Sequence, residues 1–317
     1  MSQKYCVMFA GQSVQAQGMC KELWKLPAAR QILERLKPSL GDDLERITTE
    51  MPGPELALTF NAQRAIHAHH LGNWFAYQAR HPETQLNGAI GHSMGVVAAL
   101  VAAGAISVED SGVFIRARAQ AFSDVCKSFT EPQGMAAVIT KKLRDLKDKI
   151  EAFPGVSLAL HNTLGKGTIG GKLADIEAFA AHAKKEGWPM KVMVLKVEGP
   201  YHTAAFAPCK SALQAAAAKI KIQAPQVPVF MGTSGLAEFN PARIQSLLVD
   251  QADHLERHFD AVWASYERGC RDFLEVAYKP QPVTWLGDQL VDDNGKPLPG
   301  VNAVAIKTEA LSGALAG

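Results

Sequence analysis

The sequence predicts an α/β protein in which a large domain with a parallel sheet is interrupted by a smaller α+β domain. Three observations predict this fold class. Short apolar runs alternate with longer helical patterns up to about residue 126, an order typical of a parallel sheet covered by helices on both faces. After the turn signal at 131–134 the composition changes and the order of elements becomes different. From residue 199 onward, apolar strand and helix patterns like those of the first part return.

The large domain is predicted to comprise residues 1–130 and 198–317. In its first part we expect a strand at 5–10, helices at 26–36 and 57–79, a strand at 86–90, and helices at 96–103 and 108–126. In its second part we expect a strand at 227–232, a long helix around 254–270, a hairpin at 291–300 and an alanine-rich end.

The small domain is predicted to comprise residues 131–197. Its elements follow the order β-α-β-β-α-β, which indicates a ferredoxin-like module inserted into the larger domain. We expect strands at 135–140, 156–162, 165–171 and 190–197, and helices at 176–186 and over the charged segment 141–150.

The overall composition excludes several classes of protein. A net charge of +2 over 317 residues gives no global attraction to nucleic acid. No apolar stretch is long enough to span a membrane, and the N-terminus lacks the pattern of a signal peptide. The five cysteines are scattered without metal-ligand spacing, which favours reduced thiols. We therefore expect a soluble protein of the cytoplasm.

The stretch LNGAIGHSMGVV at 86–97 is the strongest chemical signal in the chain. Ser93 lies between Gly91 and Gly95 in the pattern G-x-S-x-G, with a buried strand before it and an apolar helix after it. A serine at such a sharp turn exposes its oxygen, and the glycines remove Cβ atoms that would collide with the strand and the helix. This α/β-hydrolase-like context predicts that Ser93 is a nucleophile; the alternative is a glycine-rich turn capped by serine.

A serine nucleophile needs a base within hydrogen-bond reach. Among the ten histidines, His202 follows a strand at a Gly-Pro turn, where loops often carry catalytic groups. His92 is adjacent to Ser93 and is expected to be structural. His254 and His258 have the spacing of one helical turn, but neither a third ligand nor an HExxH pattern accompanies them, so we expect no metal site.

Six short motifs occur in one unbroken order over about residues 5–276. They are FAGQSVQ at 9–15, NAQ at 61–63, GHSMG at 91–95, IRARAQ at 115–120, HNTLGKGTIGG at 161–171 and GPYH at 199–202. In these motifs the chain resembles the acyltransferase family of malonyl-CoA:acyl carrier protein transacylases, as a divergent member. The resemblance implies transfer of a malonyl group from CoA to the phosphopantetheine thiol of a carrier protein through an acyl-enzyme, in fatty-acid or polyketide-type biosynthesis.

The resemblance also assigns roles to residues at the reacting centre. Ser93 attacks the thioester, and His202 acts as general base and then as general acid. In this family a backbone carbonyl orients the imidazole; the matching region lies around Gln251, with Asp250 or Asp253 as the alternative. The backbone N–H groups of two residues, Gln12 and Met94, form the oxyanion hole. Gln63, Asn162 and Gln251 have supporting positions.

Arg118 matches the family's arginine for the free carboxylate of the malonyl group. A guanidinium binds a carboxylate bidentately, and Arg116 is expected on another side of the same helix. The alternative is that Arg118 forms a structural salt bridge. Tyr201 is bulky, which resembles malonyl-selective members more than those that accept a branched methylmalonyl group.

Other features bear on partners and on the competing interpretations. Carrier proteins are typically acidic, so a basic segment with Lys141, Lys142 and Arg144 is a candidate docking surface; a merely solvated charged helix is the alternative. The implied reaction needs no cofactor beyond the CoA thioester. Departures from the family pattern include Ser13 in place of glycine and Val96 in place of an acidic residue. A serine hydrolase or thioesterase acting on carrier proteins, or a non-catalytic carrier-binding scaffold, remains as the alternative function.

Overall fold

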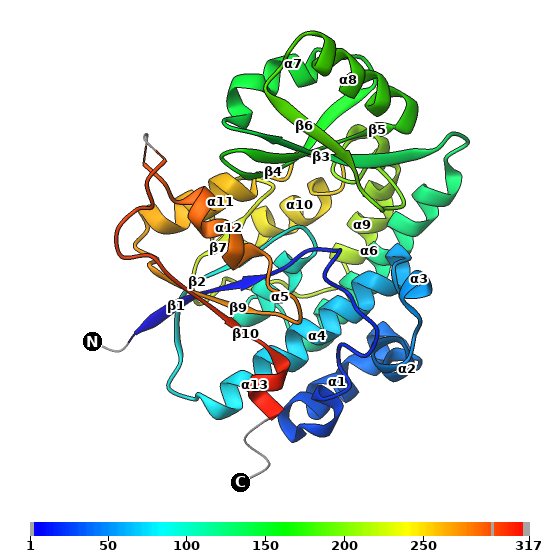
Figure 1. Ribbon diagram of the computed structural model, residues 1–317. Coiled ribbons are helices and arrows are strands. Elements are labelled where there is room, and N and C mark those ends of the chain that lie inside the picture. The colour runs from blue at the N-terminus through cyan, green and yellow to red at the C-terminus, as the bar shows by residue number, and fades with distance from the viewer. Residues whose placement is uncertain (1–2, 293–294, 313–317) are drawn as a thin grey trace.

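The parallel sheet that the sequence predicts forms the centre of the large domain (Figure 1). The computed structural model describes residues 3–292 and 295–312. The strand order is β10-β9-β1-β2-β7-β8, and neighbouring strands are parallel except for the antiparallel pair β7 and β8. The strands are β1 (Lys4–Phe9), β2 (Gln85–Gly91), β7 (Val229–Met231), β8 (Leu236–Glu238), β9 (Asp272–Val276) and β10 (Asn302–Ile306).

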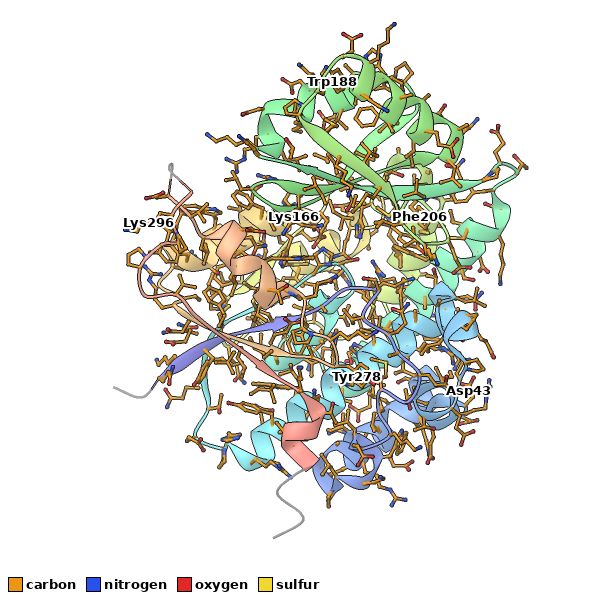
Figure 2. All side chains as sticks on the ribbon, in the orientation of Figure 1. Asp43, Lys166, Trp188, Phe206, Tyr278 and Lys296 are labelled. Atoms are coloured by element: carbon orange, nitrogen blue, oxygen red, sulfur yellow. The ribbon has the colours of Figure 1, made fainter. Side chains whose placement is uncertain are left out.

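Helices cover both faces of this sheet, as predicted (Figures 1 and 2). Alternate residues of β1 point to opposite faces: Val7 and Phe9 belong to the larger apolar core, whereas Cys6 and Met8 belong to a second core. The larger core lies against α1 (Pro27–Leu40), α4 (Thr59–Arg80), α5 (Gly95–Ala102) and α6 (Val108–Ser128), and the second against α11 (His258–Glu267) and α12 (Pro282–Gln289).

Further helices lie between and after these elements. They are η1 (Leu23–Lys25), α2 (Leu44–Thr49), α3 (Gly53–Leu56), η3 (Ala204–Cys209), α9 (Lys210–Ala217), α10 (Pro241–Asp250) and α13 (Thr308–Ser312). Within the described residues, no helix is both long and apolar enough to cross a membrane.

The small domain has the predicted ferredoxin-like order of elements. Its four strands pair in the order β4-β5-β3-β6, and every neighbouring pair is antiparallel. Helices on one face enclose a separate apolar core around Phe179, while Gly170 on the other face lies against Pro200 and Thr203 of the large domain. The elements are β3 (Gln133–Thr140), η2 (Leu143–Leu146), α7 (Lys147–Glu151), β4 (Val156–Thr163), β5 (Lys166–Lys172), α8 (Leu173–Lys185) and β6 (Met190–Val194).

Two predicted helices are wrong in extent. The helix expected around 254–270 begins only at His258, because the preceding residues are extended: Glu256 donates its N–H to Ala159 O (2.9 Å) and accepts from His161 N (2.9 Å). The charged segment 141–150 is a 3₁₀ turn followed by a short helix rather than one continuous helix.

The end of the chain contributes more than the sequence indicated. β10 adds a parallel strand to the edge of the main sheet, and α12 covers the second core. The predicted hairpin at 291–300 is present as a turn in which Asp292 N–H donates to Lys296 O (2.8 Å). Residues 293–294 of this turn and the alanine-rich end at 313–317 lie outside the described residues.

Adding a methyl group at Gly95 should prevent normal packing of α5 on β1. A Cβ at this position would lie 2.4 Å from Phe9 O and 2.6 Å from Ala10 O, and backbone atoms cannot move aside. We expect Gly95→Ala to lower the free energy of unfolding by about 3 kcal/mol, measured by urea denaturation. Gly287→Ala is the matched control: among the described residues, no atom outside its chain neighbours and its own helix backbone lies within 4 Å of the added Cβ, so a gain of about 0.5–1 kcal/mol is expected from helix propensity. Equal effects of the two changes would contradict the packing argument.

Candidate active site

The turn between β2 and α5 places Ser93 at the carboxyl end of the central parallel strands. β2 ends at Gly91 and α5 begins at Gly95, and Ser93 between them has a left-handed backbone with φ +49°. A Cβ on Gly91 would lie 2.0 Å from Val96 N, so only glycine allows the helix to start this close to the strand. The expected steric role of the flanking glycines is therefore confirmed.

Ser93 and His202 meet across this turn. Ser93 Oγ lies 2.8 Å from His202 Nε2, and His202 Nδ1 lies 2.7 Å from the backbone O of Gln251. A carbonyl only accepts, so Nδ1 carries the proton and Nε2 is left to accept the serine hydrogen. Burial, with Arg118 nearby, lowers the pKa of His202 to about 3, which keeps the imidazole neutral near pH 7. The pair has the geometry of a nucleophile and its base.

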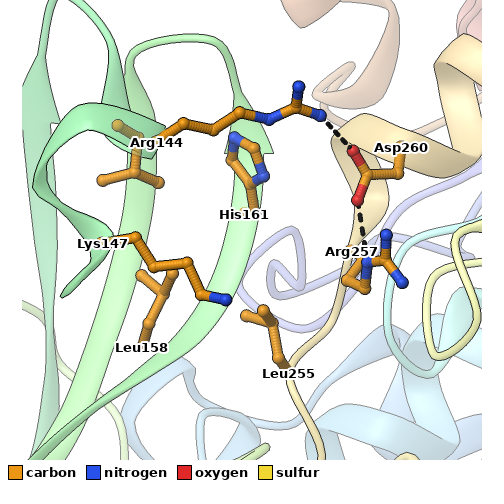
Figure 3. A pocket seen from close by; sticks show the side chains of 8 residues that line it. Arg144, Lys147, Leu158, His161, Leu255, Arg257 and Asp260 are labelled. Carbon is orange, nitrogen blue, oxygen red and sulfur yellow. Dashed lines mark hydrogen bonds and ion pairs between the residues drawn. The ribbon is translucent and has the colours of Figure 1, made fainter. Parts of the chain in front are cut away.

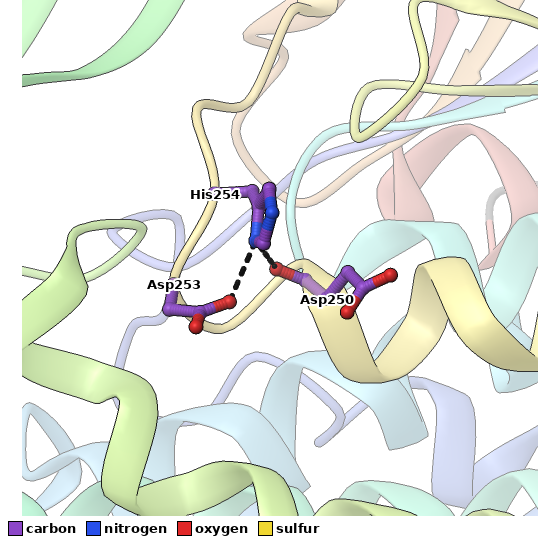
Figure 4. A group of neighbouring side chains, drawn as sticks. All are labelled: Asp250, Asp253 and His254. Carbon is purple, nitrogen blue, oxygen red and sulfur yellow. Dashed lines mark hydrogen bonds and ion pairs between the residues drawn. The ribbon is translucent and has the colours of Figure 1, made fainter.

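The alternative that an aspartate orients His202 is wrong. Asp250 and Asp253 instead form ion pairs with Lys210 Nζ at 2.8 and 3.4 Å. Figure 4 shows His254 Nδ1 beside Asp253 Oδ1 (2.6 Å) and the backbone O of Asp250 (2.9 Å). These three side chains lie close enough to one another to suggest a cation site, but they already use one another and Lys210 as partners. His254 also precedes α11, so the expected helical-turn spacing of His254 and His258 does not exist.

Arg118 lies on α6 and points at the nucleophile. Its side chain is 2% exposed, and Nη2 donates to Ser93 Oγ at 3.3 Å. No ion pair within the described residues involves Arg118, so the salt-bridge alternative is not supported. Burial lowers the pKa of Arg118 to about 10, and the guanidinium remains charged at neutral pH. Arg116 is exposed on another side of the helix, as expected.

Two of the three supporting residues contact Arg118 directly. Gln63 Oε1 accepts from Nη1 (2.7 Å), and Gln251 Oε1 accepts from Nη2 (3.2 Å). Asn162 acts elsewhere: its Oδ1 lies 2.9 Å from His92 Nε2. His92 is buried against Gly11, and burial lowers its pKa to about 4, in agreement with the structural role expected for it.

The two predicted oxyanion donors lie on the loops that flank Ser93. Met94 precedes α5, and Gln12 lies in the loop after β1. In the described part of the chain, neither backbone N–H donates a hydrogen bond to another group. The structure gives no test of their role, which stays a prediction. Ser13, next to Gln12, has φ +100°, a conformation that favours the glycine usual at this position in the family.

Three aromatic side chains pack beside the guanidinium of Arg118. Phe122 lies under Arg118, whose Cζ is 4.1 Å from the ring centroid, and Tyr201 stacks on Phe122 at 5.7 Å. The hydroxyl of Tyr201 is 2.5 Å from Thr59 Oγ1, so the ring is held at both ends. Phe206, labelled in Figure 2, packs against both Phe122 and Tyr201.

Sequence reasoning missed Glu256, a carboxylate at the turn itself. Its side chain is 0% exposed, and Oε1 accepts the backbone N–H of Ser93 at 3.0 Å. Burial raises the pKa of Glu256 to about 7. The sequence predicts a helix over this segment, and nothing in it indicates that the side chain turns toward Ser93.

A cavity of about 580 Å³ lies on the other side of the extended segment that carries Glu256 (Figure 3). Side chains of adjacent extended residues point in opposite directions, so Leu255 and Arg257 line this cavity while Glu256 faces Ser93. Arg144 crosses to the large domain and donates to Asp260 at 2.7 Å, and Arg257 donates to the same carboxylate at 2.8 Å.

Ser93 and His202 have the arrangement of a serine nucleophile with its base, and the comparisons with known proteins show the family. Residues 7–303 match the family model described as an acyl transferase domain, and the chain belongs to this family. It is 29% identical over 283 residues to the malonyl CoA-acyl carrier protein transacylase of Bacillus subtilis, covering 86% of each chain. Among solved structures, it is similar to the acyl-carrier-protein-S-malonyltransferase of Bartonella henselae, with 26% identity, a TM-score of 0.87 and coverage of 99% and 98% of this chain and that chain. It is also similar to the structure of MCAT from Mycobacterium tuberculosis, with 26% identity, a TM-score of 0.85 and coverage of 99% of this chain and 100% of that chain.

Replacing Ser13 by glycine should stabilise the protein without slowing acylation. An L-residue at φ +100° is strained, and the Ser13 hydroxyl has no hydrogen bond to any residue that the structure describes. We expect Ser13→Gly to raise the free energy of unfolding by about 0.5–1 kcal/mol. Ser157→Gly, at an exposed strand position with negative φ, should lower it by about the same amount. The check is urea denaturation of both variants; a loss of stability in Ser13→Gly would refute the strain argument.

Proposed function

We propose that this chain transfers a malonyl group from CoA to the phosphopantetheine thiol of an acyl carrier protein. One observation carries the proposal: a buried, charged arginine points at the nucleophile and has no direct carboxylate partner within the described residues. A free carboxylate on the acyl group supplies that partner. Relatives with names that state this activity support the choice of malonyl.

The first half-reaction forms an ester on Ser93. The hydroxyl proton moves to His202 Nε2 as Oγ attacks the thioester carbonyl carbon. The C–S bond then breaks, and the leaving CoA thiolate takes the proton from His202. The backbone N–H groups of Gln12 and Met94 are the proposed donors to the negative oxygen of the tetrahedral intermediate.

The second half-reaction reverses this sequence with a new thiol. The carrier thiol gives its proton to His202, and its sulfur attacks the ester carbonyl. The C–O bond breaks, and Ser93 Oγ recovers the proton. No electrons are gained or lost, so we propose that the enzyme needs no metal or redox cofactor and that CoA enters only as substrate.

The proposed selectivity combines charge and shape. Arg118 has two nitrogens on the same edge of a planar group, which match the two oxygens of a carboxylate. Tyr201 is held by Thr59 and by ring packing on Phe122, so it does not move easily to admit a branched methylmalonyl group.

The charge requirement is tested by acylation of Arg118→Ala. We expect malonylation by malonyl-CoA to slow about 10²–10³-fold, because a charge-assisted bidentate contact is lost, while acetylation by acetyl-CoA is spared or improved. Intact-protein mass spectrometry after brief incubation with each thioester measures both rates. Arg118→Lys keeps the positive charge but not the two parallel N–H donors, so its malonylation rate should lie between those of the wild type and Arg118→Ala.

Ser93→Ala is the control for the site of attachment and should give no adduct with either donor. Equal losses on both thioesters in Arg118→Ala would make Arg118 structural. Release of free malonate in preference to transfer to a thiol would favour a hydrolase, and absence of any adduct or free acid would favour a scaffold.

We propose that the carrier protein docks on the basic segment 141–144, at the start of η2 in the small domain. Lys141 and Lys142 are exposed, and neither takes part in an ion pair within the described residues. Arg144 forms an ion pair with Asp260, so it adds to the positive potential of the segment but is not expected to contact the carrier directly. An acidic partner meets this surface with complementary charge.

Charge reversal of the two free lysines tests the docking surface. We expect Lys141→Glu with Lys142→Glu to raise the KM for an acidic carrier about fivefold and to reduce its dependence on salt, with the KM for malonyl-CoA unchanged. The control is Lys21→Glu with Lys25→Glu; these residues precede α1, which lies at the end of the molecule away from the small domain (Figure 1), and Lys25 pairs with Glu22. Steady-state kinetics with a carrier protein measure all three quantities, and identical effects of the two double variants would exclude this segment as the docking surface.

We further propose that the protein acts in the cytoplasm. All five cysteines are free thiols, and four of them are buried, as suits a reducing compartment.

A further inference from the structure

Glu256 lies between the small sheet and the nucleophile turn. Its backbone is bound to the edge of β4 through Ala159 O and His161 N, each at 2.9 Å. Its side chain turns to the opposite side and becomes fully buried beneath Ser93. The carboxylate is pressed against Gly232, where an added Cβ would lie 2.0 Å from Oε1. Pairing with β4, burial under Ser93 and contact with Gly232 therefore fix the position of this carboxylate.

Both hydrogen-bond partners of the carboxylate are donors. Oε1 accepts the backbone N–H of Ser93 at 3.0 Å, and Oε2 accepts the side-chain amide of Gln251 at 3.3 Å. An ionised carboxylate satisfies both contacts. A protonated Glu256 would carry an O–H for which neither partner is an acceptor, and one of the two contacts would weaken.

The same contacts connect Glu256 to Arg118. Gln251 donates from Nε2 to Glu256 and to the backbone O of Ser93 (3.0 Å), and accepts at Oε1 from the guanidinium. The amide therefore lies between a buried cation and a buried anion, with its dipole aligned to both. Arg118 is the charged group that acts on Glu256. His202 contacts Ser93 and Gln251, and burial lowers its pKa and that of His92, so both imidazoles are neutral near pH 7.

We propose that Glu256 is a positioning residue for Ser93 and the counter-ion of Arg118 in the resting enzyme. Its ionised form holds the backbone of the nucleophile turn and the amide of Gln251, and through that amide it keeps the guanidinium directed at Ser93 Oγ. The carboxylate of an incoming acyl group then replaces it as the direct partner of Arg118. This last step rests on the proposed function; the positioning of Ser93 does not.

The inference has a signature in the pH profile. The pKa of Glu256 is raised above its ordinary value to about 7, so the ionised form predominates above that pH and is lost as the pH falls through it. Acylation of Ser93 should therefore slow on the acid side of about pH 7 and level off about tenfold below its plateau, the rate expected with a neutral side chain at this position. This fall in rate is the acid limb of the profile. His202, with a pKa of about 3, titrates too low to cause this loss.

The experiment measures the rate of Ser93 modification across neutral pH with two reagents, malonyl-CoA and an organofluorophosphonate. The second phosphonylates a serine with release of fluoride and needs no carboxylate clamp. We expect the wild type to show the acid limb with both reagents. Glu256→Gln should abolish the limb and lower the plateau about tenfold, and Glu256→Asp should keep the limb at a reduced rate.

Glu275 provides a matched control. It is also a fully buried glutamate whose pKa is raised by burial to about 7, and its carboxylate accepts backbone N–H groups of Gln281 and Val283 at 3.0 Å. Glu275→Gln should leave the acid limb unchanged even where it lowers stability.

Three results would overturn the inference: a wild type without the limb, a Glu256→Gln variant that retains it, or its loss in Glu275→Gln. The first needs no variant to fold. If malonyl-CoA fails to acylate any form while the fluorophosphonate profile behaves as expected, the proposed function fails and the positioning role of Glu256 stands.

Discussion

The close approach of α5 to the end of β2 is the constraint on which the site depends. Phe9 O and Ala10 O lie where a Cβ on Gly95 would be, and Val96 N lies where a Cβ on Gly91 would be. Between these two contacts Ser93 adopts a left-handed backbone, and His202 opposite it does the same. Strained residues of this kind persist only where the surrounding structure over-determines them. Here two glycine contacts and the parallel sheet around β2 provide that support.

Gln251 joins the parts of the site that come from distant segments. Its backbone carbonyl sets the tautomer of His202, and its side chain contacts Arg118, the backbone O of Ser93 and Glu256. One residue therefore contacts both His202, the proposed base, and Arg118, the proposed partner of the acyl carboxylate. A displacement of Gln251 would therefore disturb the positions of His202 and Arg118 together.

The sequence was most informative where local chemistry is restrictive. The G-x-S-x-G turn, the alternation of strands and helices, and the ferredoxin-like order of the insert all depend on residues close in the chain, and each was predictable. Roles that depend on the family, such as those of Arg118 and Gln251, required the resemblance. Glu256 was not predictable, because its extended backbone comes from pairing with β4, a contact about a hundred residues distant in the chain. β10 was missed for the same reason, since a parallel edge strand is specified by its partner β9 rather than by its own pattern.

The position of Glu256 also bears on Val96, one of the departures from the family pattern. Family members often have an acidic residue directly after the nucleophile turn, where this chain has the buried Val96. The turn nevertheless has a carboxylate, which reaches Ser93 N–H from a segment 163 residues further along the chain. A buried carboxylate is costly unless donors and a cation compensate it, and here two donors contact it while Arg118 lies beyond the Gln251 amide. The cation proposed to bind the acyl carboxylate is therefore also the buried charge that offsets Glu256, so the two buried charges depend on each other.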